Sequence, residues 1–245
     1  MTTRFDFSGR TVLVTGGVSG IGAATSLAFK RAGASVIACG LTVEELTAAR
    51  GDARFEGIEI EPLDVTDRGA VDALLGRLRT LDFVVNSAGT IRRDAEHDPD
   101  VFDQVIDVNL SGGMRVSAAA RPLLRASRGA IVFVGSVMSF FGGPRQPAYS
   151  ASKGAVRNLT MSLACAYAAD GIRVNAVAPG WVITNLSRGA REDAQRNALI
   201  MARIPMGRWA EPDEIADPIL FLCSDAARYM SGTVMLVDGG YTSAG

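Results

Sequence analysis

The chain has 245 residues, a length that suits one α/β domain better than two. Its 25 Lys and Arg residues nearly balance 26 Asp and Glu residues, and the formal charge of −1 argues against a dedicated nucleic-acid or anionic-membrane binder. Apolar residues make up 48%, which excludes a largely disordered chain. Residues 1–6 lack the apolar run of a signal peptide, and no run approaches a membrane span, so a cytoplasmic protein is expected.

Short apolar runs, often β-branched, alternate with segments of helical periodicity along the whole chain. Strands of a parallel sheet look like these runs because helices cover both faces of the sheet. The alternation predicts a doubly wound parallel α/β sheet of about seven strands with helices on both faces, in a single domain over residues 1–245. The predicted strands are residues 11–15, 35–39, 58–60, 81–86, 130–134, 172–177 and 233–237.

One stretch within this alternation, residues 185–204, is polar and rich in arginine. It could be a surface helix. It could equally be a mobile lid over the carboxyl ends of the strands, where open α/β sheets bind their ligands. The sequence leaves both interpretations open.

The cysteines and the histidine offer little for disulfide or metal chemistry. Cys39, Cys165 and Cys223 are widely spaced and form no CxxC pair, so they are expected to be buried, reduced and inert. His97 is the single histidine, and it lies in a polar stretch typical of a solvated loop. No metal site is therefore expected.

A glycine-rich turn follows the first predicted strand and begins the first helix. Within residues 15–22, Gly16 permits the sharp turn, Gly20 lets the backbone approach a pyrophosphate, and Gly22 lets helix and strand pack closely. Free N–H groups and the positive end of the helix would then face the anion. Any tight strand-to-helix turn could use glycines, so this motif alone is weak support for a nucleotide site.

The spacing of these glycines, with three residues and then one between them, resembles the short-chain dehydrogenase/reductase family in its short, single-domain branch. The family's other motifs follow in order and extend the resemblance over essentially the whole chain. It implies a Rossmann-type fold and an NAD(P)-dependent oxidoreductase that interconverts a secondary alcohol and a ketone. The matching motifs are Asn86-Ser87-Ala88-Gly89, Asn109, Ser136, Tyr149 and Lys153 in Tyr-x-x-x-Lys, Pro179-Gly180, and Val237-Asp238-Gly239-Gly240.

Tyr149 and Lys153 stand one helical turn apart and so share a helix face. A free phenol has a pKa of about 10, and a nearby ammonium is expected to lower the pKa of Tyr149 toward the working range of a general acid/base. Ser136 is expected to hydrogen-bond the reacting oxygen. The resemblance further implies that Lys153 holds the nicotinamide ribose and that Asn109 helps to hold a water chain that resupplies protons.

The resemblance also implies which residues form the two binding sites. Asp64 matches the family position that meets the adenine. The expected substrate residues are Ser136, Met138, Tyr149 and Trp181. The expected cofactor-binding residues are Gly16, Ser19, Gly20, Ile21, Gly22, Leu41, Asp64, Val65, Asn86, Ala88, Gly89, Tyr149, Lys153, Pro179, Gly180, Val182 and Thr184.

The choice between NAD and NADP depends on the end of the second predicted strand. An acidic residue there normally recognises the ribose of NAD, but Gly40 occupies that position. In the family, enzymes that prefer NADP usually place an arginine just after it or a basic residue within the glycine-rich turn, where this chain has Leu41 and Gly17. A 2′-phosphate would have no cation to pair with, so NAD is favoured over NADP. Thr42 or a backbone N–H could still contact the ribose.

The substrate is less clearly indicated. Residues 88–93 and 203–209 resemble sugar-acid and polyol dehydrogenases. Arg92 and Arg93 could meet a carboxylate, although loop arginines are more often solvated. Trp181 would equally suit an apolar ketone. Two alternatives stay open: a 3-oxoacyl thioester reductase, which would need NADPH and a basic docking patch, and a non-catalytic dinucleotide sensor.

Family analogy also predicts a homotetramer. Small residues such as Ala118–Ala120 and Ala164 on the helices predicted near residues 102–126 and 150–169 would permit close helix–helix contact. The same residues would also suit packing on the sheet.

Overall fold

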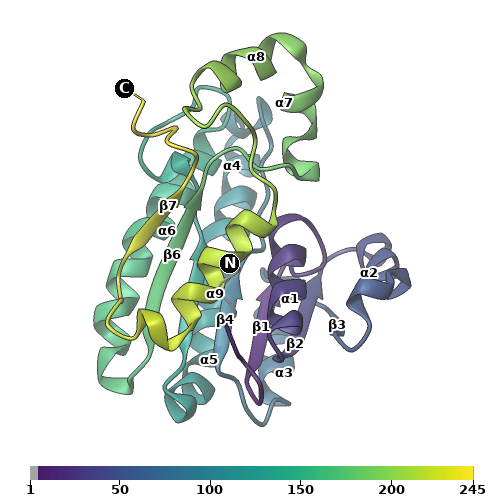
Figure 1. The fold of residues 1–245 in the computed structure, drawn as a ribbon, viewed down its shortest axis with the longest axis vertical. Coiled ribbons are helices and arrows are strands. Elements are labelled where there is room, and N and C mark those ends of the chain that lie inside the picture. The colour runs from purple at the N-terminus through teal and green to yellow at the C-terminus, as the bar shows by residue number, and fades with distance from the viewer. Residues whose placement is uncertain (1–4, 245) are drawn as a thin grey trace.

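The computed structural model describes residues 5–244, so the few positions of the predicted domain outside this range are not described. One sheet of seven parallel strands runs through the molecule in the order β3-β2-β1-β4-β5-β6-β7 (Figure 1). The predicted α/β architecture and each predicted strand are confirmed, with small shifts at the ends. The strands are β1 (Thr11–Thr15), β2 (Ser35–Gly40), β3 (Glu59–Pro62), β4 (Phe83–Asn86), β5 (Ala130–Val134), β6 (Arg173–Pro179) and β7 (Val234–Val237).

The strand order reverses beside β1, because the chain builds outward to β3 and then returns to place β4 on the other side of β1. The connections after β1 and β4 therefore diverge, which opens a crevice at the carboxyl ends of these strands. Helices cover both faces of the sheet (Figure 1). They are α1 (Gly20–Arg31), α2 (Val43–Gly51), α3 (Arg68–Gly76), α4 (Pro99–Ile106), α5 (Gly113–Ser127), α6 (Pro147–Tyr167), α7 (Arg188–Glu192), α8 (Ala194–Ala202) and α9 (Asp213–Cys223).

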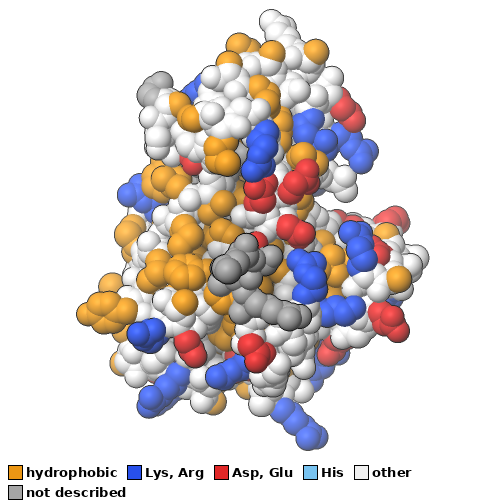
Figure 2. Space-filling view, in the orientation of Figure 1, with side chains coloured by type: hydrophobic (Ala, Val, Ile, Leu, Met, Phe, Trp, Pro, Cys, Tyr) orange, Lys and Arg blue, Asp and Glu red, His pale blue; other side chains and the backbone are white. Residues whose placement is uncertain are grey.

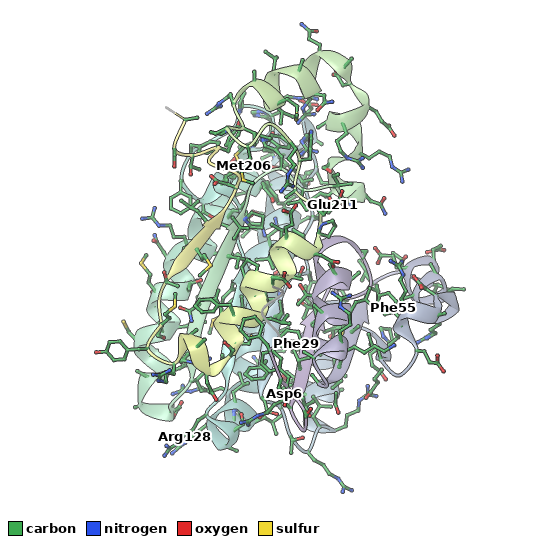
Figure 3. All side chains as sticks on the ribbon, viewed as in Figure 1. Asp6, Phe29, Phe55, Arg128, Met206 and Glu211 are labelled. Carbon is green, nitrogen blue, oxygen red and sulfur yellow. The ribbon has the colours of Figure 1, made fainter. Side chains whose placement is uncertain are left out.

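Alternation along each strand divides the core into two layers. Val12 and Val14 of β1 face the layer under α1 and α9, whereas Leu13 faces the layer under α3, α5 and α6, and all three are fully buried. Phe29 of α1, labelled in Figure 3, stacks on Phe83 of β4 with ring centroids 6.1 Å apart. This packing fixes α1 against the sheet near the amino end of β4.

The helix predicted near residues 102–126 contains a wide turn. Asp98 caps α4 by accepting a hydrogen bond from the N–H of Asp100 at 2.8 Å, and Pro99 occupies the first turn. Residues Asp107–Gly112 then form a π-helical turn before α5 continues. Such turns occur often at functional sites, and this one carries Asn109.

The arginine-rich stretch 185–204 is helical, as one interpretation predicted, and contains α7 and α8. These helices lie beyond the carboxyl ends of the strands, at the top of Figure 1. Ala190 and Ile200 pack there with Trp209 and Tyr241 in a third apolar cluster. Movement of this stretch as a lid stays a prediction.

Within residues 5–244, no helix combines the length and apolarity needed to cross a bilayer.

Candidate active site

A cavity of about 700 Å³ lies at the carboxyl ends of β1, β4, β5 and β6. Figure 2 shows an indentation of the surface between α2 and the α7–α8 region. Most of the residues predicted to bind cofactor or substrate line the cavity. They are Gly16, Ser19, Gly20, Ile21, Leu41, Asp64, Val65, Ala88, Gly89, Ser136, Met138, Tyr149, Lys153, Pro179, Gly180, Trp181, Val182 and Thr184.

The glycine-rich turn has the geometry of an anion cradle. Gly16 and Gly20 have φ angles of 61° and 51°, a region that favours glycine. A Cβ on Gly22 would lie 2.1 Å from the carbonyl oxygen of Gly16, so Gly22 serves the close packing predicted for it rather than lining the cavity. Ser19 caps α1 but its hydroxyl makes no capping hydrogen bond, which leaves it free for a ligand. These features fit the pyrophosphate of a dinucleotide.

The structure does not bring Asn86 to the cavity. Its amide nitrogen donates a hydrogen bond to Ser117 Oγ at 3.0 Å, because the alternation of β4 directs this side chain toward α5. The N–H groups of Ser87 and Ala88 instead join the end of β4 to β1 through Thr15 Oγ1, each at 3.1 Å. In a buried strand, alternate side chains point to opposite faces of the sheet. This alternation could have shown that the Asn86 side chain points away from the cavity, and that the motif holds the loop after β4 through its backbone.

Asn109 lies beneath the cavity wall rather than in it. Its Oδ1 accepts a hydrogen bond from the N–H of Thr90 at 2.7 Å, and its Nδ2 donates to the carbonyl of Thr90 at 2.9 Å and to Ser152 Oγ at 3.1 Å. Both amide hydrogens are thus used to join the loop after β4 to α6. The predicted support of a water chain stays a prediction, and these amide hydrogens do not supply it.

Tyr149, Lys153 and Ser136 meet on one wall of the cavity. Tyr149 lies in the first turn of α6 and Lys153 one turn later, while Ser136 follows β5. The ammonium of Lys153 donates a hydrogen bond to the carbonyl of Val134 at 2.8 Å and stands 5.5 Å from the centroid of the Tyr149 ring. The helical spacing therefore brings the pair to the same side of α6, as predicted.

The electrostatics of this wall differ from the sequence expectation. Burial raises the pKa of Tyr149 above its usual value of 10.0, against opposing effects of the hydrogen bond with Ser136 and the charge of Arg93. Burial also lowers the pKa of Lys153 to about 8. Desolvation outweighs the charges around the phenol, and the groups that lower the pKa of Tyr149 are Ser136 and Arg93 rather than Lys153.

Two further residues complete the substrate end of the cavity. Gln146 is buried and lines it, although no motif in the sequence points to this residue. Arg93 is half-buried and also lines it, which corrects the expectation of a solvated loop arginine; its neighbour Arg92 lines the cavity as well but is exposed. The Arg93 Nε and the Trp181 Nε1 are buried without a hydrogen-bond partner. Burial lowers the pKa of Arg93 from its usual value, with a further effect from Arg196.

At the opposite end, the cavity reaches the turn between β2 and α2. A Cβ on Gly40 would lie 2.6 Å from Val18 Cγ2, so the usual acidic side chain would fit here only if the Val18 side chain moved. Glu45, which the sequence reasoning missed, lines the cavity and accepts long hydrogen bonds from the N–H groups of Leu41 at 3.4 Å and Thr42 at 3.5 Å. The capping pattern of Thr42 and Glu45 is the sequence signal that could have found it.

The cysteines have no place in this site. All three thiols are free, and Cys39 and Cys223 are buried, but Cys165 is exposed, contrary to expectation. It lies on α6, where the preceding Ala164 is buried and the following Ala166 is exposed. Among the described residues, no group of three or more His, Cys, Asp or Glu side chains is arranged to hold a metal ion.

The family model described as enoyl-(acyl carrier protein) reductase matches residues 16–242. Among curated proteins, the chain is 40% identical to 2-dehydro-3-deoxy-D-gluconate 5-dehydrogenase of Pseudoalteromonas atlantica, over 98% of this chain and 99% of that protein. It is also 40% identical to 3-oxoacyl-[acyl-carrier-protein] reductase of Thermotoga maritima (95% and 97% covered). The same identity relates it to cis-4-hydroxycyclohexanecarboxylate dehydrogenase of Sinomonas cyclohexanicum (97% and 98% covered).

A solved structure shows the same similarity. It is a putative NAD(P)-dependent gluconate 5-dehydrogenase from Beutenbergia cavernae with bound NADP. Its TM-score is 0.88 at 39% identity, over 98% of this chain and 99% of that one. The chain therefore belongs to the short-chain dehydrogenase/reductase family of NAD(P)-dependent oxidoreductases.

Proposed function

We propose that this dehydrogenase interconverts the secondary alcohol and the ketone of a small hydroxy acid, with NAD as the cofactor. The observation that carries the proposal is the half-buried guanidinium of Arg93, which lines the same cavity as Tyr149, Ser136 and Lys153. Among the described residues, Arg93 makes no ion pair with Asp or Glu, and its Nε has no partner. Its Nη1 donates a long hydrogen bond of 3.4 Å to the carbonyl of Leu186. A partly desolvated cation that pairs with no carboxylate favours an anionic ligand.

Tyr149 takes the proton of the substrate hydroxyl in oxidation and returns it in reduction. Ser136 holds the reacting oxygen beside the phenol. When bound, NAD would supply the hydride acceptor for the alcohol carbon, and its positive charge would favour the phenolate form of Tyr149. Lys153, fixed to β5 through the carbonyl of Val134, holds the cofactor ribose beside Tyr149.

Four features of the adenosine end support NAD over NADP. A Cβ on Gly17 would lie 2.6 Å from the carbonyl oxygen of Val14, so the turn cannot carry a basic side chain. A Cβ on Gly40 would press against the Val18 side chain, and Leu41 carries no charge. The carboxylate of Glu45 occupies the N–H groups of Leu41 and Thr42, where it would repel a 2′-phosphate. A ribose hydroxyl could donate to the same carboxylate.

The names of two relatives support an acid as the substrate. Both 2-dehydro-3-deoxy-D-gluconate 5-dehydrogenase and cis-4-hydroxycyclohexanecarboxylate dehydrogenase are named for substrates with a carboxylate. In both names, the numbering puts the hydroxyl-bearing carbon four bonds from the carboxyl carbon. We infer a substrate of this kind, a δ-hydroxy acid, whose carboxylate binds Arg93.

A second candidate, reduction of a 3-oxoacyl thioester, is favoured by the relative in Thermotoga maritima. That reaction would place an uncharged acyl chain near Arg93 and is less suited to an unpaired cation. A non-catalytic sensor would not need the buried Lys153, whose burial is costly.

We also propose a homotetramer. Hydrophobic side chains gather on the surface over β7 and α9 in Figure 2. Leu236 of β7 is 44% exposed, Met161 of α6 is 40% exposed and Tyr229 is fully exposed. Exposed apolar groups on an edge strand are typical of a surface that pairs with another copy. The mass of the protein in solution, measured by light scattering, tests this proposal.

An activity screen tests the proposed reaction. Sugar acids, 4-hydroxycyclohexanecarboxylate, uncharged secondary alcohols and 3-oxoacyl thioesters would be compared with NAD(H) and NADP(H). The proposal expects NAD-linked oxidation of a hydroxy acid, and Tyr149→Phe should bind NADH normally but lose nearly all turnover. Preference for a 3-oxoacyl thioester with NADPH would instead support the second candidate, and tight NADH binding without any turnover would support a sensor.

A further inference from the structure

Glu96 is a buried carboxylate that the proposed chemistry does not use. It lies in the short turn Ala95–His97 after the loop that follows β4, and only 1% of it is exposed. It does not line the cavity. Among the described residues, it takes part in no ion pair, and its carboxylate oxygens accept hydrogen bonds from backbone N–H groups. Burial of such a group costs free energy unless hydrogen bonds replace its contacts with water, so these bonds are expected to be maintained.

The two hydrogen bonds of Glu96 reach both walls of the substrate end. Its Oε1 accepts from the N–H of Arg92 at 2.8 Å, and its Oε2 accepts from the N–H of Tyr149 at 2.8 Å. Arg92 directly precedes Arg93, whose guanidinium lines the cavity. One carboxylate therefore joins the backbone that carries the proposed anion-binding residue to the backbone that carries the proposed acid/base.

Two other links join residues 92–97 to residues 144–149, but they are made by exposed residues. Asp94 donates its N–H to the carbonyl of Arg145 at 2.7 Å and pairs with the guanidinium of Arg145. His97 Nε2 lies 3.0 Å from the carbonyl oxygen of Pro144. Exposed contacts of this kind contribute little and yield to solvent. Glu96 is the buried link, and its two oxygens have a fixed separation.

We propose that Glu96 is a positioning residue that sets the separation between the Arg93 guanidinium and the Tyr149 hydroxyl, and so selects substrates by the number of carbons between carboxylate and alcohol. This inference rests on the proposed function, since it requires an acid that spans the two groups. A substrate held at one end by charge reacts only if its alcohol reaches the phenol, and a misplacement of about 1 Å can cost 100-fold in rate. Glu96 acts on the fit of the substrate without touching it.

The test uses a series of secondary alcohols that differ only in length. 4-Hydroxypentanoate, 5-hydroxyhexanoate and 6-hydroxyheptanoate would be oxidised with NAD, together with 2-hexanol as an uncharged reference. The wild-type enzyme should prefer one acid. Glu96→Gln loses one acceptor oxygen. In this variant the ratio of kcat/KM between the best and the other acids should fall at least about fivefold, mainly because KM for the best acid rises, and Glu96→Ala should lower the ratio further.

The matched control is Glu56→Gln, an exposed glutamate whose side chain contacts no hydrogen-bond or ion-pair partner within residues 5–244, and it should leave the preference unchanged. Tm and the Kd of NADH, measured by fluorescence titration, show whether each variant keeps its fold and cofactor site. Arg93→Met should itself flatten the preference, and Glu96→Gln should then add no further flattening, because both residues act on the same fit.

These measurements distinguish a failure of the Glu96 role from a failure of the proposed hydroxy-acid function. An unchanged preference in both Glu96 variants with normal NADH binding overturns the positioning role, as does an equal loss for all three acids and for 2-hexanol. If the wild-type enzyme oxidises 2-hexanol or a thioester substrate but none of the acids, the proposed hydroxy-acid function falls, and this inference falls with it.

Discussion

The ammonium of Lys153 is held between two elements: it donates to the carbonyl of Val134 at the end of β5 and faces the ring of Tyr149 at 5.5 Å on its own helix. The lysine thus fixes the first turns of α6 against the sheet. Its burial lowers its pKa to about 8, so the folded protein bears the cost of a partly desolvated cation at neutral pH.

Replacement of this lysine should make the protein more stable while abolishing turnover. A shift of the Lys153 pKa from 10.5 to about 8 corresponds to a cost of about 3 kcal/mol at pH 7. Loss of the hydrogen bond to Val134 would offset about 1 kcal/mol of the gain. Lys153→Met should therefore raise the free energy of unfolding by about 2 kcal/mol at pH 7, as measured by urea denaturation.

The pH dependence of the unfolding free energy tests whether desolvation of Lys153 is the cause of this difference. The unfolded chain keeps the lysine proton up to its usual pKa of 10.5, whereas the folded protein releases it near pH 8. The contribution of Lys153 to the free energy of unfolding thus rises with pH between these values. The advantage of Lys153→Met should shrink over the same range. A difference that stays constant from pH 7 to pH 10 would contradict the assigned cause.

Cofactor preference should respond to Leu41 and not to Gly40. Leu41 is 62% exposed and can be replaced by arginine without a steric cost, so Leu41→Arg should lower the Kd of NADPH at least about tenfold. Gly40→Asp should weaken the fold instead of improving NAD binding, because its Cβ would meet Val18. Fluorescence titration with NADH and NADPH, together with Tm, distinguishes the two effects.

The role of Glu45 is tested in the same assay. Glu45→Gln should improve NADPH binding while it changes NADH binding less, because the amide no longer repels the 2′-phosphate. The effect should diminish in high salt. Equal changes in the Kd of both nucleotides would mean that Glu45 does not discriminate between them.

Gly22 should not tolerate even the smallest side chain. A Cβ there would lie 2.1 Å from the carbonyl oxygen of Gly16, within the cradle itself. Gly22→Ala should therefore destroy NADH binding and lower Tm. Gly76→Ala is the matched control, because a Cβ at Gly76 meets nothing within 4 Å, and it should leave both measurements nearly unchanged.

The two neighbouring arginines should behave differently. Arg93→Ala should raise the KM for a hydroxy acid by about 10- to 100-fold, the usual range for loss of a charge-assisted hydrogen bond. Arg92→Ala should change it by less than about threefold, since the exposed Arg92 side chain is screened by water. Similar effects of both substitutions would show that charge in the loop, rather than the position of Arg93, attracts the acid.

The sequence predicted the strands because the buried runs of a parallel sheet differ clearly in pattern from the helices between them. It also predicted that Tyr149 and Lys153 share a helix face, since that depends only on helical spacing. It could not separate Arg93 from Arg92, because burial of one loop arginine depends on how residues 185–187 approach from another part of the chain. It misjudged the pKa of Tyr149 for a similar reason: desolvation depends on the whole wall and not on one neighbour.

The π-helical turn at Asp107–Gly112 has a consequence for how this region tolerates change. One residue advances an α-helix by about 100°, so the extra residue of the wide turn sets the faces of α4 and α5 out of phase. Each helix can then present its apolar side to different neighbours. A single-residue deletion here would restore a regular helix and rotate α4 relative to α5 by about 100°. Changes in the length of this turn should therefore be poorly tolerated.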